Sequence, residues 1–131
     1  MNNTEFMSGV AAELWKKRVR RLDPRDPASH RAFYDTLREI DGGIVEKAGL
    51  EFYFDPITGN IADLFNLSSS LQGFALGRRP NPTYPETELV LSSEASEELL
   101  SILKSEERSL VSSFAERFAR KLQATESVIG I

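Results

Sequence analysis

The stretch "SLVSSFAERFARKL", residues 109–122, decides the fold class of this chain of 131 residues. Its large apolar side chains recur at intervals of three and four residues: Leu110, Val111, Phe114, Phe118 and Leu122. This spacing places them on one stripe of an α-helix, and such a stripe must be buried against another surface. The sequence therefore predicts an amphipathic C-terminal helical segment in a mainly helical protein.

Two surfaces are open as the burial partner of this stripe: the protein's own core and a second copy of the chain. The stripe is large for a chain whose other helices already supply a core. We therefore predict a homodimer whose interface is formed by Leu110, Phe114, Phe118 and Leu122. A core position for the same residues stays open as the alternative.

Capping signals predict the other helices. Asn2 or Asn3 is expected to cap a first helix that runs to about Leu22, and Glu5 suits its positive end. Asp26 followed by Pro27 opens a second helix, which should end at "DGG", residues 41–43. Ser92 or Ser93 should cap a third helix. The polar "KSEERS", residues 104–109, is either a break capped by Ser105 or a turn within one long helix.

Alternating apolar residues predict a minor strand component. "LEFYF", residues 50–54, alternates apolar with other side chains, and "DPITGN" after it has turn residues. We expect a hairpin over about 50–66 and a further strand over about 86–91. The expected fold class is α+β: a single globular domain, 1–131, mainly helical with a small antiparallel sheet.

Composition narrows the class of protein. The chain is 40% hydrophobic and 27% charged, which is ordinary for a folded protein that dissolves in water. It has no cysteine, which excludes disulfides and thiolate metal sites. No signal peptide or apolar run of membrane-spanning length is seen in the sequence, so we expect a cytoplasmic protein that does not insert into a membrane.

No motif favours catalysis, and we predict a non-enzymatic protein without catalytic residues, metal ligands or a cofactor. The one histidine, His30, is expected to be a solvated surface residue. "GFALG", residues 73–77, lacks the Gly-Lys-Ser/Thr ending of a phosphate-binding loop. The acid pairs Asp23 with Asp26 and Glu39 with Asp41 lie at helix termini, where such residues serve as caps.

A basic stretch, "WKKRVRR" at residues 15–21, stands out in a chain of net charge -4. In a continuous helix, Lys16, Lys17, Arg20 and Arg21 share one flank, while Arg18 falls within the apolar stripe. Glu13 precedes Lys16 and Lys17 at helical spacing and should compensate part of this charge. A solvated helix face is the simplest interpretation of such a pattern.

The function class that fits these features best is a small intracellular protein-interaction module: an adaptor, a chaperone-like protein or an inhibitor that occupies the surface of another protein. This class includes small proteins encoded by mobile elements. Its partner-binding rim is predicted to contain Lys16, Lys17, Arg20, Arg21, Arg78 and Arg79. A nucleic-acid-associated regulator that uses the basic helix 16–21 is the alternative, although the sequence pI near 5.1 argues against it. An enzyme whose site is assembled from dispersed carboxylates is the second alternative.

Overall fold

The computed structural model describes residues 1–19, 21–23, 26–40, 49–52, 55, 57, 59, 61, 77–78 and 87–129, without the side chains at 77–78, 87–88 and 124–129. Within these residues the chain is mainly helical, as predicted. The helices are α1 (Asn3–Lys16), α2 (Pro27–Glu39), α5 (Ser93–Ser101) and α6 (Ser105–Ile129).

Three of the predicted caps are confirmed. The Asn2 side chain accepts a hydrogen bond from the Glu5 N–H at 2.8 Å, and the Glu5 carboxylate accepts one from the Asn2 N–H at 3.0 Å. This reciprocal pair is a capping box, which satisfies two backbone donors at the start of α1. The Asp26 and Ser92 side chains cap α2 and α5 in the same position.

The "KSEERS" segment is a break between two helices rather than a turn in one. The helix α5 ends at Ser101 and α6 begins at Ser105. Glu107, in the first turn of α6, accepts a hydrogen bond from the Lys104 N–H at 2.9 Å and pairs with the Met1 ammonium at 2.9 Å. The hydrogen bond from Lys104 is the main reason that the pKa of Glu107 lies below its usual value.

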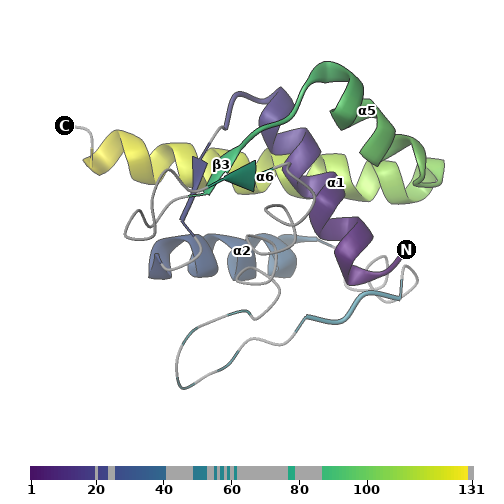
Figure 1. Cartoon of the computed structure of the whole chain (residues 1–131). Coiled ribbons are helices and arrows are strands. Elements are labelled where there is room, and N and C mark those ends of the chain that lie inside the picture. Colours follow the sequence, from purple (N-terminus) through teal and green to yellow (C-terminus); the bar gives the residue numbers. More distant parts are fainter. Residues whose placement is uncertain are drawn as a thin grey trace.

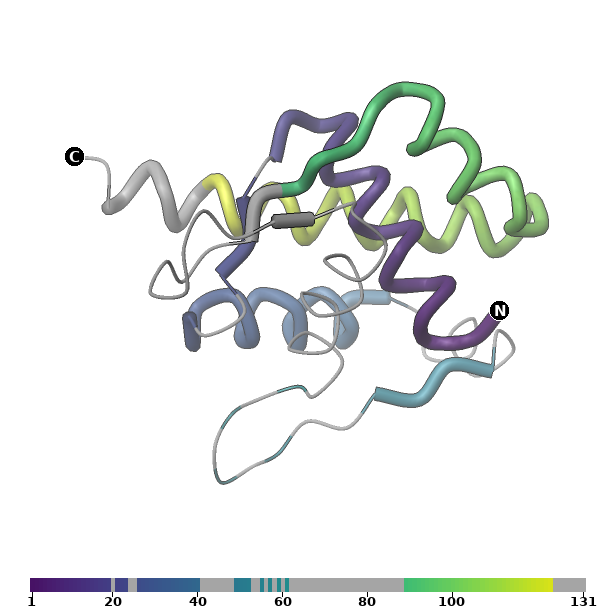
Figure 2. The backbone as a smooth tube through the Cα atoms, viewed as in Figure 1, coloured from purple at the N-terminus to yellow at the C-terminus, as the bar shows by residue number. Residues whose placement is uncertain are grey.

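The longest helix, α6, is the support on which α1 and α2 pack (Figure 1). The first helix, α1, crosses α6 and also contacts α5, while α2 lies along α6 (Figure 2). Ion pairs fasten α2 to α6, since the Glu39 carboxylate lies 2.9 Å from Lys121 Nζ and 3.6 Å from Arg117 Nη1. The Lys121 hydrogen bond is the largest cause of the lowered pKa of Glu39.

Aromatic rings from three helices meet in the core. The Phe114 ring of α6 lies 4.8 Å from the Phe33 ring of α2 and 5.2 Å from the Phe6 ring of α1, both edge to face. Phe118 packs against Phe33 at 5.5 Å. Each of these four rings is at most 1% exposed, so each contributes roughly 1.5–3 kcal/mol of hydrophobic stabilisation.

Gly9 allows α1 to approach α6 closely. A Cβ atom at this position would lie 3.1 Å from Val111 Cγ1 and 3.3 Å from Leu103 Cδ1, tighter than ordinary packing. Glycine lowers helix propensity in a helix interior, so the benefit at this position is the short distance between the two helices. Gly9 therefore fixes where α1 crosses its neighbours.

The small antiparallel sheet that we predicted from a hairpin at 50–66 and a strand at 86–91 is not supported, although a short strand does lie within 86–91. Residues 50–52 form no strand, and most of the remaining hairpin lies outside the described residues. The β-pairing that is described is limited to two residue pairs on each side of β3 (Thr87–Leu89), with β1 (Arg21–Leu22) and β2 (Gly77–Arg78).

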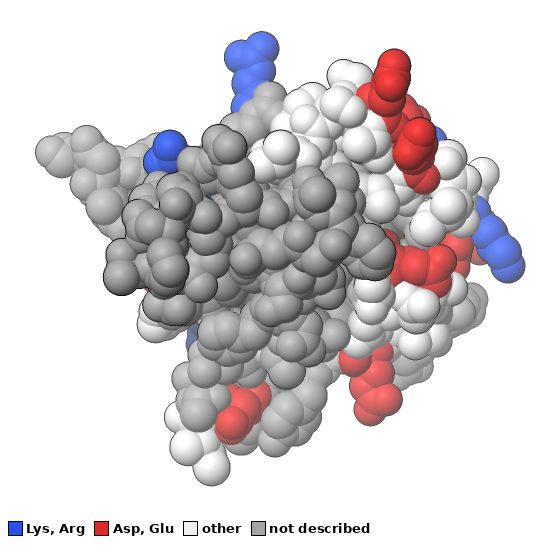
Figure 3. Space-filling view, viewed as in Figure 1, with Lys and Arg blue, Asp and Glu red and all other residues white. Residues whose placement is uncertain are grey.

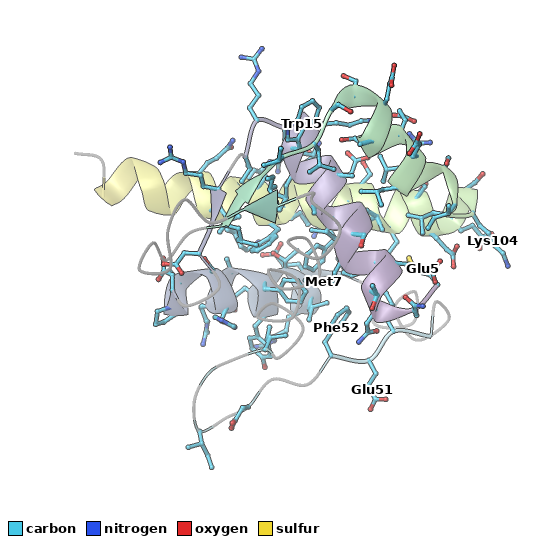
Figure 4. The ribbon with its side chains drawn as sticks, viewed as in Figure 1. Glu5, Met7, Trp15, Glu51, Phe52 and Lys104 are labelled. Carbon is cyan, nitrogen blue, oxygen red and sulfur yellow. The ribbon has the colours of Figure 1, made fainter. Side chains whose placement is uncertain are left out.

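The 50–52 segment is held by a side chain instead of a strand partner. The Asn3 Nδ2 donates a hydrogen bond to the Glu51 carbonyl oxygen at 2.7 Å. Leu50 is buried, and the Phe52 ring lies 5.3 Å from the Phe6 ring; Phe52 points toward α1 whereas Glu51 points away (Figure 4). The apolar alternation therefore correctly indicated that Leu50 and Phe52 face the core. The strand that it also indicated is not formed at residues 50–52.

Candidate partner-binding surface

The basic stretch does not form one helix, because α1 ends at Lys16 rather than near Leu22. The Arg18 N–H donates to the Trp15 carbonyl at 3.1 Å, and the Val19 N–H donates to the Leu14 carbonyl at 2.9 Å. Arg18 has a φ of 67°, in the left-handed region. These two bonds and the positive φ define a Schellman motif, a helix stop that usually has glycine where this chain has Arg18.

The Schellman motif corrects the predicted position of Arg18. Arg18 is exposed rather than directed at the apolar stripe, while Val19 and Leu22 are 7% and 4% exposed and lie in the core. Among the described residues, the Arg18 guanidinium makes no ion pair or hydrogen bond. The reversal after α1 thus sends the apolar residues inward and places Arg18 at the tip of the turn.

Two further cations are close to Arg18 in the sequence. Lys17 is half-buried at the end of α1, and Arg21 is exposed on β1. We call Lys17, Arg18 and Arg21 the cationic turn. Its backbone is fixed by the two Schellman hydrogen bonds and by the pairing of Arg21 with Glu88 of β3.

Lys16, the first residue of the predicted rim, makes an internal ion pair. Its Nζ binds the Glu97 carboxylate of α5, and Arg108 Nη2 of α6 binds the same carboxylate at 2.9 and 3.1 Å. The Lys16 hydrogen bond, followed by that of Arg108, lowers the pKa of Glu97. Glu97 therefore joins three helices, and it compensates the charge of Lys16 in place of Glu13, which is buried.

The remaining rim residues are only partly described. Arg20 and Arg79 lie outside the described residues. The backbone of Arg78 lies in β2 and pairs with Glu88, which pairs on its other side with Arg21. Two strand spacings, roughly 10 Å, therefore separate Arg78 from Arg21, with an acidic residue in the register position between them.

The predicted oligomer interface lies in the protomer core. Phe114 and Phe118 are fully buried, Leu110 is 6% exposed, and Leu122 packs against the core while partly buried. The stripe is covered because α1 and α2 both pack on α6. The predicted homodimer therefore lacks the surface from which it was inferred.

His30 is fully buried, which corrects its predicted place on the surface. Its Nδ1 accepts a hydrogen bond from the Ile61 N–H at 2.9 Å. An imidazole that accepts at Nδ1 and is neutral has its proton on Nε2. Periodicity could not locate this contact, because its partner lies 31 residues away in sequence.

Within the described part of the chain, no group of three or more His, Cys, Asp or Glu residues could hold a metal ion. No described helix has both the length and the apolar character needed to cross a membrane.

Charge is distributed unevenly over the described surface. The cationic turn follows α1, whereas α5 exposes Glu94, Glu97 and Glu98. On the face shown in Figure 3, a basic side chain projects from the upper edge, and acidic side chains gather on the right. Such asymmetry can orient a charged partner before contact.

Arg18 is the functional candidate that sequence reasoning missed. The sequence carries no signal for it, because a left-handed residue is recognised when it is glycine or asparagine and not when it is arginine. Comparison with protein-family models, with curated protein sequences and with solved structures found no match to this chain.

Proposed function

We propose that this protein is a non-enzymatic interaction module of the cytoplasm that acts by occupying an acidic surface of another protein. The observation that carries the proposal is the cationic turn, in which charged side chains extend from a backbone that is already fixed. Fixing a binding loop before association lowers the entropy cost of the complex. An exposed basic patch also speeds the encounter with an acidic partner.

The proposed rim differs from the six cations named from the sequence, because Arg18 takes the place of Lys16. Lys17, Arg18 and Arg21 form its described part, and Arg20, Arg78 and Arg79 remain predicted members. Lys16 is left out of the rim, because its charge is compensated by the Glu97 carboxylate. An adaptor, an inhibitor and a chaperone-like protein all remain compatible with this surface.

The proposal is tested by charge reversal with a matched control. A partner is recovered from the native host by affinity purification, identified by mass spectrometry and purified. Lys17→Glu with Arg21→Glu should slow its association and flatten the dependence of the association rate on salt. The control, Arg31→Glu with Arg120→Glu, makes the same change of charge at side chains that are 67% and 72% exposed on α2 and α6.

Equal association rates for the two double variants would refute the proposed surface. Duplex DNA provides the test of the nucleic-acid alternative. A patch that engages three phosphates would give a log–log salt slope of about -2.7. Tight DNA binding with that slope, abolished by the Lys17 and Arg21 reversals, would establish the alternative instead.

A further inference from the structure

The left-handed conformation of Arg18 has a cost that no contact among the described residues offsets. Its φ of 67° brings Cβ close to the following carbonyl oxygen, a clash that glycine avoids. The Arg18 side chain is exposed and makes no ion pair or hydrogen bond within the described residues. Arginine at this position is therefore less favourable for stability than glycine, and no described contact of its side chain compensates.

The rest of the motif is well formed, so the turn does not depend on this side chain. Both Schellman hydrogen bonds are present, and Leu14 and Val19, which such motifs bring together, are buried. Glycine would keep these bonds and remove the clash. Retaining arginine is therefore explained best by a role outside the folded protomer, because backbone strain is found where function requires it.

From this placement we infer that Arg18 is the anchor of the proposed interface and binds a carboxylate on the partner protein. The inference rests on the proposed function and adds the residue and the ligand chemistry. A guanidinium donates two parallel hydrogen bonds to a carboxylate, and arginine is enriched among residues that dominate binding energy. Arg18 lies at the tip of the turn, and Lys17 and Arg21 flank it along the chain.

The surrounding charges favour a compact acidic patch over an extended polyanion. Nucleic acid runs far beyond one turn, so its phosphates would face more of the surface of a protein whose net charge is -4. A protein carboxylate contacts the turn alone, and screening over roughly 8 Å at physiological salt removes most of the repulsion from more distant acids. The partner is therefore inferred to be an acidic protein surface.

The test uses three substitutions at one position, with a short oligoglutamate peptide as the carboxylate probe and duplex DNA as the phosphate probe. Arg18→Gly removes both the side chain and the strain. Arg18→Ala removes the side chain but keeps the Cβ clash, and Arg18→Lys keeps the charge but not the planar fork. Binding is measured on full-length protein by biolayer interferometry, and Tm by thermal unfolding.

Arg18→Gly should raise Tm by about 3 °C and weaken binding of the oligoglutamate peptide about tenfold. Arg18→Ala should bind as poorly without the rise in Tm, and Arg18→Lys should bind with intermediate affinity. The expected result is thus that the most stable variant is among the weakest binders. A role in stability alone would not produce this inverse order.

Two failures are distinguishable. If wild type binds, the Lys17 and Arg21 reversals abolish binding and Arg18→Gly keeps wild-type affinity, the anchor is refuted while the proposed surface stands. If wild type does not bind the oligoglutamate peptide, or binds duplex DNA more tightly, the acidic protein partner is refuted and the inference with it.

Discussion

Truncation of Phe114 tests whether the α6 stripe is core or interface. Phe114 is fully buried, and its ring contacts Phe6, Phe33 and Phe118 at centroid distances of 5.2, 4.8 and 5.7 Å. Phe114→Ala removes these contacts and leaves a cavity among three helices. The expected loss is about 3–5 kcal/mol in the free energy of unfolding, a large part of the roughly 5–15 kcal/mol of an ordinary domain.

Urea unfolding followed by circular dichroism measures this loss. With a slope of about 2 kcal/mol per M, the midpoint should fall by roughly 2 M. Ile102→Ala is the control, because Ile102 is an apolar residue that is 61% exposed and its truncation should change stability by about 0.5 kcal/mol or less. Similar midpoints for the two variants would contradict the burial of Phe114.

Phe114→Asp separates the two interpretations in sedimentation. A core position predicts gross unfolding, since an unpaired carboxylate would replace a ring that contacts three others. A folded monomer obtained from a dimeric wild type would refute the core position and restore the predicted homodimer.

Three further predictions concern polar groups. Ser96 Oγ is buried and has no hydrogen-bond partner within the described chain, so Ser96→Ala should raise the free energy of unfolding by about 1 kcal/mol. Thr36→Val is the contrast: it removes a hydroxyl that donates to the Ala32 carbonyl at 2.7 Å, and it should lower the free energy of unfolding. His30→Leu leaves the Ile61 N–H unpaired and should cost about 1–3 kcal/mol, with faster hydrogen exchange at that amide. The pKa values of the Glu39, Glu97 and Glu107 carboxyls are lowered in the folded protein, so these groups stabilise it above about pH 4.5. Urea midpoints should therefore fall as the pH drops below about 4.5. The fall should be smaller in the variant that has glutamine at all three positions.

The helix starts could be predicted from sequence because each depends on neighbours in the chain. The Asn2 and Glu5 pair, Asp26 before Pro27, and Ser92 each act over three residues or fewer. The end of α1 could not be predicted, because the left-handed residue there is an arginine. The continuous helix drawn from periodicity placed Arg18 inward, and the reversal of the chain placed it outward.

Long-range contacts limited the prediction of the site and the core. Lys16 was expected on a free rim, but its partner Glu97 lies 81 residues away. The Phe114 stripe was correctly identified as a buried helix face, but periodicity cannot tell whether the covering surface belongs to the same chain. The alternation at residues 50–54 indicated burial of Leu50, and the backbone partner there is the Asn3 side chain, which no strand pattern signals.

The contact of α1 with α6 has a consequence for synthesis of the protein in the cell. Gly9 and Phe6 of α1 meet Val111 and Phe114 of α6, so the N-terminal helix completes its packing with residues made 102 and 108 positions later. At about 5–20 residues per second, the apolar side chains of α1 wait roughly 5–20 s for α6 to be translated. During that interval the apolar side chains of α1 are accessible to chaperones and to other unfinished chains.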